Sequence, residues 1–147
     1  MKVVIDHEAN QVDDKILSDG VFESHADLIG KRDESFSVFL KNDSGKILGG
    51  AQVSFDTESC YVNSLWVDNQ LRGQGYGKQL LNMVEQEAIE NGCHLSTTNT
   101  WDFQAEGFYL KSGYIRIGEI KNYWKGHSMI FLRNPSSGFS AQQFNGR

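Results

Sequence analysis

The sequence contains little proline and little cysteine, and it has fewer positively than negatively charged residues. Its 147 residues include 1 Pro and 2 Cys, and 14 Lys and Arg stand against 19 Asp and Glu, which gives a formal net charge of −5 and a pI of about 5.3. General binding to nucleic acid depends on clustered Lys and Arg that neutralise phosphates, so this balance argues against a nucleic-acid partner. It mildly favours a small partner that is cationic or neutral.

Long apolar runs are also missing. No segment approaches the roughly 18 apolar residues that span a bilayer, and the early Asp6 and Glu8 are unlike a secretory signal, so we expect neither membrane insertion nor export and take the cytoplasm as the default location. Cys60 and Cys93 lie in apolar, strand-like stretches without CxxC or Cys/His spacing. The sequence therefore predicts two free core thiols rather than a disulfide or a zinc site, and it indicates no metal.

The chain nevertheless has enough apolar and aromatic residues to form one hydrophobic core. Its hydrophobic fraction is 39%, with 9 Phe, 5 Tyr and 3 Trp, and its length suits a single domain, which we place at residues 1–135. Residues 136–147 are rich in Ser, Gly, Gln and Asn, a composition typical of a disordered tail.

The first half of the chain combines helical periodicity with strand-like alternation. Gly49 and Gly50 lie inside one of the strand-like runs and predict a bulge or a close approach of another backbone. The elements expected in this half are an edge strand over Lys2 to Asp6, a helix with Val12, Ile16 and Leu17 that is interrupted at Gly20, a helix from Phe22 to Ile29 that ends at Gly30, and strands over 36–40, 47–55 and 60–67.

The second half begins with a clear amphipathic helix, because Leu80, Leu81, Val84 and Ala88 share one face and Gly92 suits its C-terminal cap. This helix separates the strand over 60–67 from the next one, so the two strands should be parallel and the sheet mixed. A ligand of such a sheet binds beyond the carboxyl ends of its parallel strands. The remaining expected elements are a strand over 93–100, a helix over 103–111 that ends at Gly113, a strand over 114–120, a loop over 121–126 and a strand over 128–133.

A glycine-rich turn from Leu71 to Lys78 connects the strand and the amphipathic helix. Glycines at 73, 75 and 77 leave backbone N–H groups uncovered at the positive end of a helix, so we expect an anion there. The spacing excludes a P-loop, because only 3 residues separate Gly73 from Gly77 and Gln79 follows Lys78; the dinucleotide fingerprint fails because its third glycine comes one position early. Taken alone, such a turn is also typical of a plain connection.

Two motifs carry a resemblance to a known family. The pattern Arg72-x-x-Gly75-x-Gly77 resembles the pyrophosphate-binding signature of the GNAT superfamily of N-acetyltransferases, and the segment from Ala105 through Tyr109 to Tyr114 resembles that superfamily's Ala-x-x-x-Tyr-x-x-x-Gly-Phe/Tyr segment. The order of elements is similar as well, and residues 123–132 resemble a bacterial subgroup of small GNAT acetyltransferases. The resemblance implies an α+β GNAT fold: a central mixed, mostly antiparallel sheet of six to seven strands, with two splayed parallel strands and about four flanking helices.

The resemblance also implies acetyl-CoA as cosubstrate. Its diphosphate would bind the amides of the glycine turn, and its pantetheine would lie between the splayed strands, where a backbone N–H polarises the thioester carbonyl. Trp66 would be core or pocket wall rather than a catalytic group. The residues implied in holding acetyl-CoA are Leu65, Trp66, Val67, Arg72, Gly73, Gln74, Gly75, Tyr76, Gly77, Lys78 and Asp102.

Tyr109 is the implied general acid, since a phenol with an ordinary pKa near ~10 protonates or hydrogen-bonds a departing thiolate. Aromatic packing is the alternative explanation for this residue. Asn63 stands where many family members carry a glutamate base, and an amide takes no proton, so a water relay or another group must do so. The candidate bases are Asp56, Glu58, Glu119 and His127, although each also suits a solvated surface. Asp102 stands where many members carry Asn, and a carboxylate accepts hydrogen bonds but donates none unless it is protonated.

We therefore predict an acetyl-CoA-dependent N-acetyltransferase that acts on a primary amine, in a small molecule rather than a peptide or protein, by direct attack in a ternary complex. The N-terminal helices and the loop over 121–126 would border the acceptor, and assembly as a homodimer stays open. Two alternatives belong to other classes: a non-catalytic acyl-CoA-binding or sensing module, which Asn63 keeps open, and an interaction domain without affinity for CoA.

Overall fold

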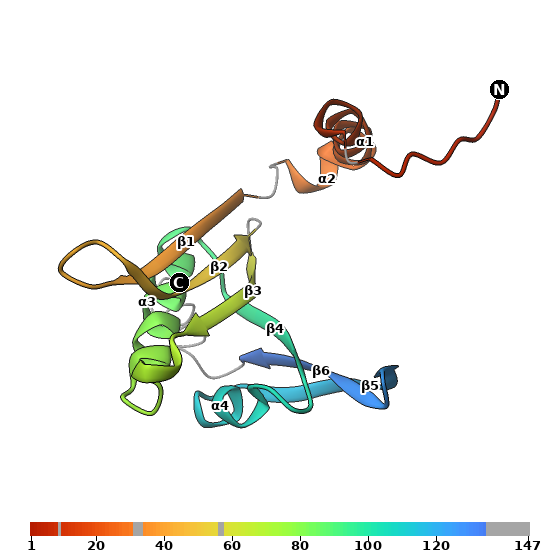
Figure 1. Cartoon of the computed structure of the whole chain (residues 1–147). Helices are drawn as coiled ribbons and strands as arrows, with labels where there is room; N and C mark the ends of the chain where they lie inside the picture. Colours follow the sequence, from red (N-terminus) through yellow and green to blue (C-terminus); the bar gives the residue numbers. More distant parts are fainter. Residues whose placement is uncertain (9, 31–33, 56–57, 135–147) are drawn as a thin grey trace. The chain divides into compact units, whose positions relative to one another are not determined.

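The computed structural model describes residues 1–8, 10–30, 34–55 and 58–134 and divides into two compact units, Met1–Arg32 and Asp33–Arg147 (Figure 1). The predicted tail, residues 136–147, and the candidate base Asp56 lie outside the described residues. Within the described ranges, every helix is too short or too polar to cross a membrane.

The first unit contains two helices, α1 (Gln11–Glu23) and α2 (Ala26–Ile29). Asn10 caps α1, because its side-chain oxygen accepts a hydrogen bond from the backbone N–H of Val12 at 3.0 Å. The predicted break at Gly20 is wrong: α1 continues through it to Glu23, since one interior glycine costs a helix only about 1 kcal/mol. The predicted end of α2 is confirmed, with Gly30 in the left-handed conformation at φ 67°.

The edge strand predicted over Lys2 to Asp6 is also wrong, because this stretch has no regular secondary structure. Its alternation of valine and isoleucine suits a strand, but a strand needs a neighbour to pair with, and the elements described in this unit are helices.

The second unit is a mixed sheet of six strands in the order β1-β2-β3-β4-β6-β5, which confirms the predicted fold class. The pairing of β3 with β4 is parallel and the other neighbouring pairs are antiparallel. The strands are β1 (Glu34–Lys41), β2 (Ile47–Phe55), β3 (Ser59–Val67), β4 (Leu95–Trp101), β5 (Ile115–Trp124) and β6 (His127–Asn134); a short 3₁₀ turn, η1 (Asn69–Leu71), and the helices α3 (Tyr76–Glu90) and α4 (Glu106–Lys111) complete the unit.

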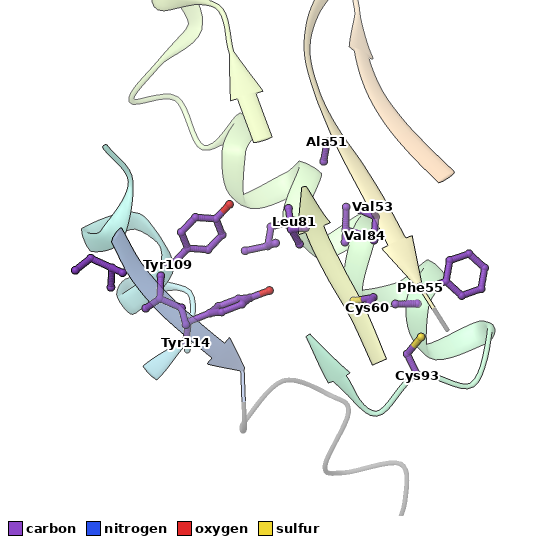
Figure 2. Packing of buried hydrophobic residues seen from close by; sticks show 13 residues of the cluster. Ala51, Val53, Phe55, Cys60, Leu81, Val84, Cys93, Tyr109 and Tyr114 are labelled. Atoms are coloured by element: carbon purple, nitrogen blue, oxygen red, sulfur yellow. The ribbon is translucent and has the colours of Figure 1, made fainter. Parts of the chain in front are cut away.

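The core lies between one face of this sheet and the helices α3 and α4 (Figure 2). The predicted apolar face of α3 is confirmed, since its buried residues are Leu80, Leu81, Val84 and Ala88. The thiols of Cys60 and Cys93 are both buried in the core, as predicted.

The hairpin between β5 and β6 differs from the predicted loop over 121–126. β5 extends to Trp124, and the chain reverses through Lys125 at φ 47° and Gly126 at φ 81°. Two successive residues with positive φ form the tight turn whose twist suits a hairpin, so most of the polar stretch is strand rather than loop.

Gly49 and Gly50 of β2 confirm the predicted close approach of backbones. A Cβ atom on Gly49 would lie 2.8 Å from the carbonyl oxygen of Trp66, and one on Gly50 would lie 2.7 Å from that of Val38. The ladder between β1 and β2 also shifts register next to Gly49, between Leu40 and Lys41.

Replacing Gly49 by alanine is therefore expected to destabilise the fold by roughly 1–3 kcal/mol, because the neighbouring backbone must move. Gly20→Ala is the matched control: a Cβ there meets nothing within 4 Å, and the change should stabilise α1 by about 0.5–1 kcal/mol. Thermal unfolding of both variants measures the difference. An unchanged melting temperature for Gly49→Ala would contradict this account of β2.

Candidate active site

A gap opens between the two parallel strands halfway along β3. The ladder between β3 and β4 runs from the pair Ser59 and Leu95 to the pair Val62 and Thr98 and then stops, although both strands continue. Beyond it β3 pairs with β2, and β4 pairs with β6. Figure 1 shows the two strands diverging toward their carboxyl ends, so they are splayed as the resemblance implies.

A bulge at Asn63 accompanies this opening. Val62 pairs with Val53 and Ser64 pairs with Gln52, which leaves Asn63 as the extra residue of β3. The bulge reverses the side-chain alternation: Cys60 and Val62 are buried before it, whereas Leu65 packs against the core after it. A regular alternation of side chains would put Tyr61 and Leu65 on one face of β3, and the bulge prevents this.

The bulge also determines where Trp66 lies. Its side chain is 48% exposed, so it is not part of the core, and the reading of Trp66 as a pocket wall stays a prediction.

The free edge of β3 offers backbone amides to the gap. Asp68 N–H donates to the carbonyl of Leu48 on β2 at 2.8 Å. Because successive N–H groups of a strand point to opposite edges, those of Leu65 and Val67 point away from β2, toward the gap. This is the arrangement expected of groups that bind pantetheine and polarise a thioester.

The glycine turn leads from β3 into α3. Arg72 Nε donates to the carbonyl of Val67 at 3.1 Å, and Gln74 Nε2 donates to that of Gln70 at 3.1 Å, so both side chains brace the turn. Gly73 and Gly75 have φ of 75° and 85° and open space where a Cβ would lie. Gly75 is the N-cap of α3 and supplies no side-chain cap, and the first turn of α3 carries no acidic residue. The first amides of α3 are therefore open to an anion.

Gly77 has a second role that the motif did not indicate. A Cβ on Gly77 would lie 3.2 Å from Cε2 of Phe108, so the glycine allows α3 to pack closely against the ring from α4. The turn is thereby fixed to the helix that carries Tyr109.

Tyr109 projects from α4 into the core and is only 4% exposed (Figure 2). Its ring packs edge-on against Phe108 and Tyr114, with centroids 5.2 Å apart in each case. Burial raises the pKa of Tyr109, a hydrogen bond with Thr98 opposes this, and the phenol of Tyr61 adds to the rise. Thr98 belongs to the last ladder pair before the gap, so this protonated phenol lies where the two strands separate.

The other face of the sheet also has a polar link across the gap. Tyr61 of β3 donates its hydroxyl to Asn99 Oδ1 of β4 at 2.6 Å, one position beyond the last ladder residue of β4. The Asn63 side chain accepts from Ser54 Oγ at 2.8 Å, and as an amide it takes no proton. The sequence could not indicate the link between Tyr61 and Asn99, because the two residues are far apart in the chain and meet only through the register of β3 with β4.

Asp102 follows the last residue of β4, and both oxygens of its carboxylate interact with residues of β6. Oδ1 lies 2.9 Å from His127 Nδ1, and Oδ2 accepts from the backbone N–H of Ser128 at 2.9 Å. A direct contact of Asp102 with pantetheine stays a prediction. Among the other candidate bases, Glu119 forms an ion pair with Arg116 at 3.3 Å.

Residues 1–8, 10–30, 34–55 and 58–134 contain no cluster of His, Cys, Asp and Glu that could hold a metal ion. What the site combines is an open set of helix amides, a strand edge with free N–H groups and a buried phenol at a strand gap. This combination suits an acyl thioester that carries a diphosphate.

Comparisons with known proteins identify acetyltransferases as relatives of this chain. A model of the acetyltransferase (GNAT) family matches residues 6–114. The blasticidin-S acetyltransferase of Streptomyces morookaense is 36% identical over 94 residues, which cover 63% of this chain and 69% of that protein.

Solved structures agree with this match. A crystal structure of an acetyltransferase from Bacillus cereus is 30% identical, covers 89% of this chain and 96% of its own, and superimposes with a TM-score of 0.76. An aminoglycoside 6'-N-acetyltransferase complexed with coenzyme A shares the fold at 16% identity, with a TM-score of 0.63 and coverage of 91% of this chain and 96% of that chain.

Proposed function

Because the chain belongs to the GNAT acetyltransferase family, which uses acetyl-CoA, we propose that it transfers the acetyl group to a primary amine of a small molecule by direct attack in a ternary complex. The observation that carries this proposal is the position of Tyr109: its protonated phenol lies beside Thr98, where the ladder between β3 and β4 ends.

The residues present fit acetyl-CoA along one path. The amides between Gly73 and Lys78 would bind the diphosphate, with helix-end attraction that contributes roughly 0.3–1 kcal/mol and up to ~2 kcal/mol when partly buried. The N–H groups of Leu65 and Val67 would hold the pantetheine and polarise the thioester carbonyl. When bound, acetyl-CoA supplies the activated acyl group.

Tyr109 would then act as general acid. Attack of the amine forms the new C–N bond and breaks the C–S bond, and the departing thiolate needs a proton or a hydrogen bond. A phenol whose pKa is raised by burial stays protonated through neutral pH and can supply it. Cys60 and Cys93 are both buried, and no acyl-enzyme step is required of them.

The similarity to a blasticidin-S acetyltransferase supports a small-molecule acceptor. A panel of amines that includes blasticidin S tests the proposal: thiol release should depend on both acetyl-CoA and the amine, and mass spectrometry should find an N-acetylated product. Tight binding of acetyl-CoA without thiol release from any amine would instead favour the non-catalytic module. Lack of thermal stabilisation by millimolar acetyl-CoA would exclude both functions.

A further inference from the structure

A group of aromatic rings lies beside His127 just beyond the carboxyl end of β4. This Trp101 cluster consists of Trp101, Phe103, Tyr123, Trp124 and His127. Trp101 stacks on Phe103 at 6.0 Å and contacts Tyr123 and Trp124 at 5.4 and 5.8 Å. Phe103, Tyr123 and Trp124 are 52%, 55% and 49% exposed, which is unusual for neighbouring rings of this size.

The imidazole of His127 contacts two of these rings. Its centroid is 4.6 Å from that of Phe103, which meets it edge-on, and 6.5 Å from that of Trp124. The rings therefore restrict the orientation of the imidazole and offer π faces that attract a cation.

Asp102 determines which imidazole nitrogen carries the proton. The backbone N–H of Ser128, together with His127 itself, lowers the pKa of Asp102, so its carboxylate is ionised at neutral pH and only accepts hydrogen bonds. Nδ1 of His127, 2.9 Å from Oδ1, must therefore be the donor. In the neutral imidazole, Nε2 then has a free lone pair and can accept a proton.

The cluster lies on the face of the sheet that bears the link between Tyr61 and Asn99. Along β4, Ser96, Thr98 and Thr100 are buried on the core face, so Asn99 and Trp101 point to the opposite face. The same alternation on β6, where Ser128 is buried, places His127 on that face beside the end of β4. An amine that approaches the gap from there passes both features.

The proposed reaction needs a proton acceptor, because an amine attacks a thioester only as the neutral base. Asn63, at the position where the resemblance implies a glutamate, cannot take the proton. His127, one of the bases considered from sequence, is held by a carboxylate at Nδ1, which leaves Nε2 to accept a proton.

We propose that His127, oriented by Asp102, is the general base for the acceptor ammonium. This inference rests on the proposed function. Nε2 removes one proton from the ammonium, directly or through one water, which leaves a neutral amine and an imidazolium whose charge Asp102 balances. The exposed ring of Phe103 attracts the ammonium before the transfer. Asp102 is a positioning residue.

Two charged groups lie near His127 and would influence a titration of its imidazole. Asp102 faces it from the turn after β4, and Lys125 of the turn between β5 and β6 places its Nζ 5.0 Å from the centroid of Trp124. Any titration assigned to His127 is therefore measured also in Lys125→Met, which keeps the length of the side chain and removes its charge.

Two amines of similar shape but different basicity distinguish a general base at position 127 from a residue with only a structural role. 2-Phenylethylamine is an ammonium at pH 7, whereas fluorines lower the basicity of 2,2-difluoro-2-phenylethylamine and increase its neutral fraction. His127→Gln should lower kcat/KM for the first at least about tenfold and for the second less than about threefold. Asp102→Asn should show the same selectivity, and His94→Ala, a histidine change at the other end of β4, should alter neither. Equal losses for both amines, or no loss, would overturn the proposal.

A binding measurement tests the role of His127 without relying on catalytic turnover. Addition of 2-phenylethylamine to the CoA-saturated protein should shift the ¹⁵N NMR signal of His127 Nε2 more than that of Nδ1. The absence of any shift would overturn the proposal even if thiol is released. Absence of thiol release from every amine would count against the proposed function instead.

Discussion

Tyr109→Phe is expected to lower kcat for acetyl transfer by at least tenfold, and by ~10² to 10⁴ if proton transfer is fully lost. The change removes one oxygen and keeps the ring that packs against Phe108 and Tyr114, so the core and the affinity for acetyl-CoA should hold. Because burial raises the pKa of Tyr109, the wild-type phenol stays protonated throughout the neutral range, and its ionisation should produce no loss of activity there. Steady-state kinetics and calorimetric titration of acetyl-CoA measure the two quantities.

Tyr114→Phe is the matched control for this variant. Tyr114 is also buried, and its hydroxyl forms a hydrogen bond of 2.7 Å with Ser96 rather than lying at the strand gap. Loss of that bond should cost roughly 0.5–1.5 kcal/mol of stability and leave kcat unchanged. Equal kcat values for Tyr109→Phe and wild type would remove Tyr109 from the chemistry.

Gly75→Ala is expected to weaken the binding of acetyl-CoA by about 10- to 30-fold, which corresponds to the ~2 kcal/mol that a partly buried helix end contributes to an anion. Gly75 has φ of 85°, which an L-residue adopts only at a cost of ~1–2 kcal/mol, so alanine should move the turn out of the geometry that presents its amides to the diphosphate. A methyl group there meets nothing within 4 Å, so it would not clash with the protein.

Gly45→Ala separates lost stability from lost binding. Gly45 lies in the turn between β1 and β2 with φ of 82° and equally open surroundings, so its replacement should carry a similar strain. We expect both variants to lose similar stability and only Gly75→Ala to lose affinity. A Kd for Gly75→Ala equal to that of Gly45→Ala would show that the glycine turn does not bind the diphosphate.

Local patterns in the sequence predicted the elements that are fixed by local periodicity. The helical spacing of Leu80, Leu81, Val84 and Ala88 correctly identified the buried face of α3. The glycine pattern identified the turn before α3, and the order of elements, together with the family motifs, predicted the mixed sheet. The helix face and the turn follow from neighbours within a few residues of each other, whereas the sheet was predicted from the order of elements and the family motifs.

Features that depend on packing between distant segments were missed. The sequence shows the alternation of side chains along β3 but not the bulge, so it could not show that the buried face changes at Asn63. The wrong break at Gly20 has a local cause instead: the low helix propensity of one glycine is outweighed by the other residues of α1. The pairing of Asp102 with His127 depends on the register of β4 with β6, which the sequence does not state.

The most direct test of the account is a crystal structure of the protein with coenzyme A. We predict that the diphosphate oxygens accept hydrogen bonds from the amides between Gly73 and Lys78, and that the sulfur lies between β3 and β4 within hydrogen-bonding distance of the Tyr109 hydroxyl. A diphosphate bound away from the glycine turn, or a sulfur on the far side of the sheet from Tyr109, would contradict it.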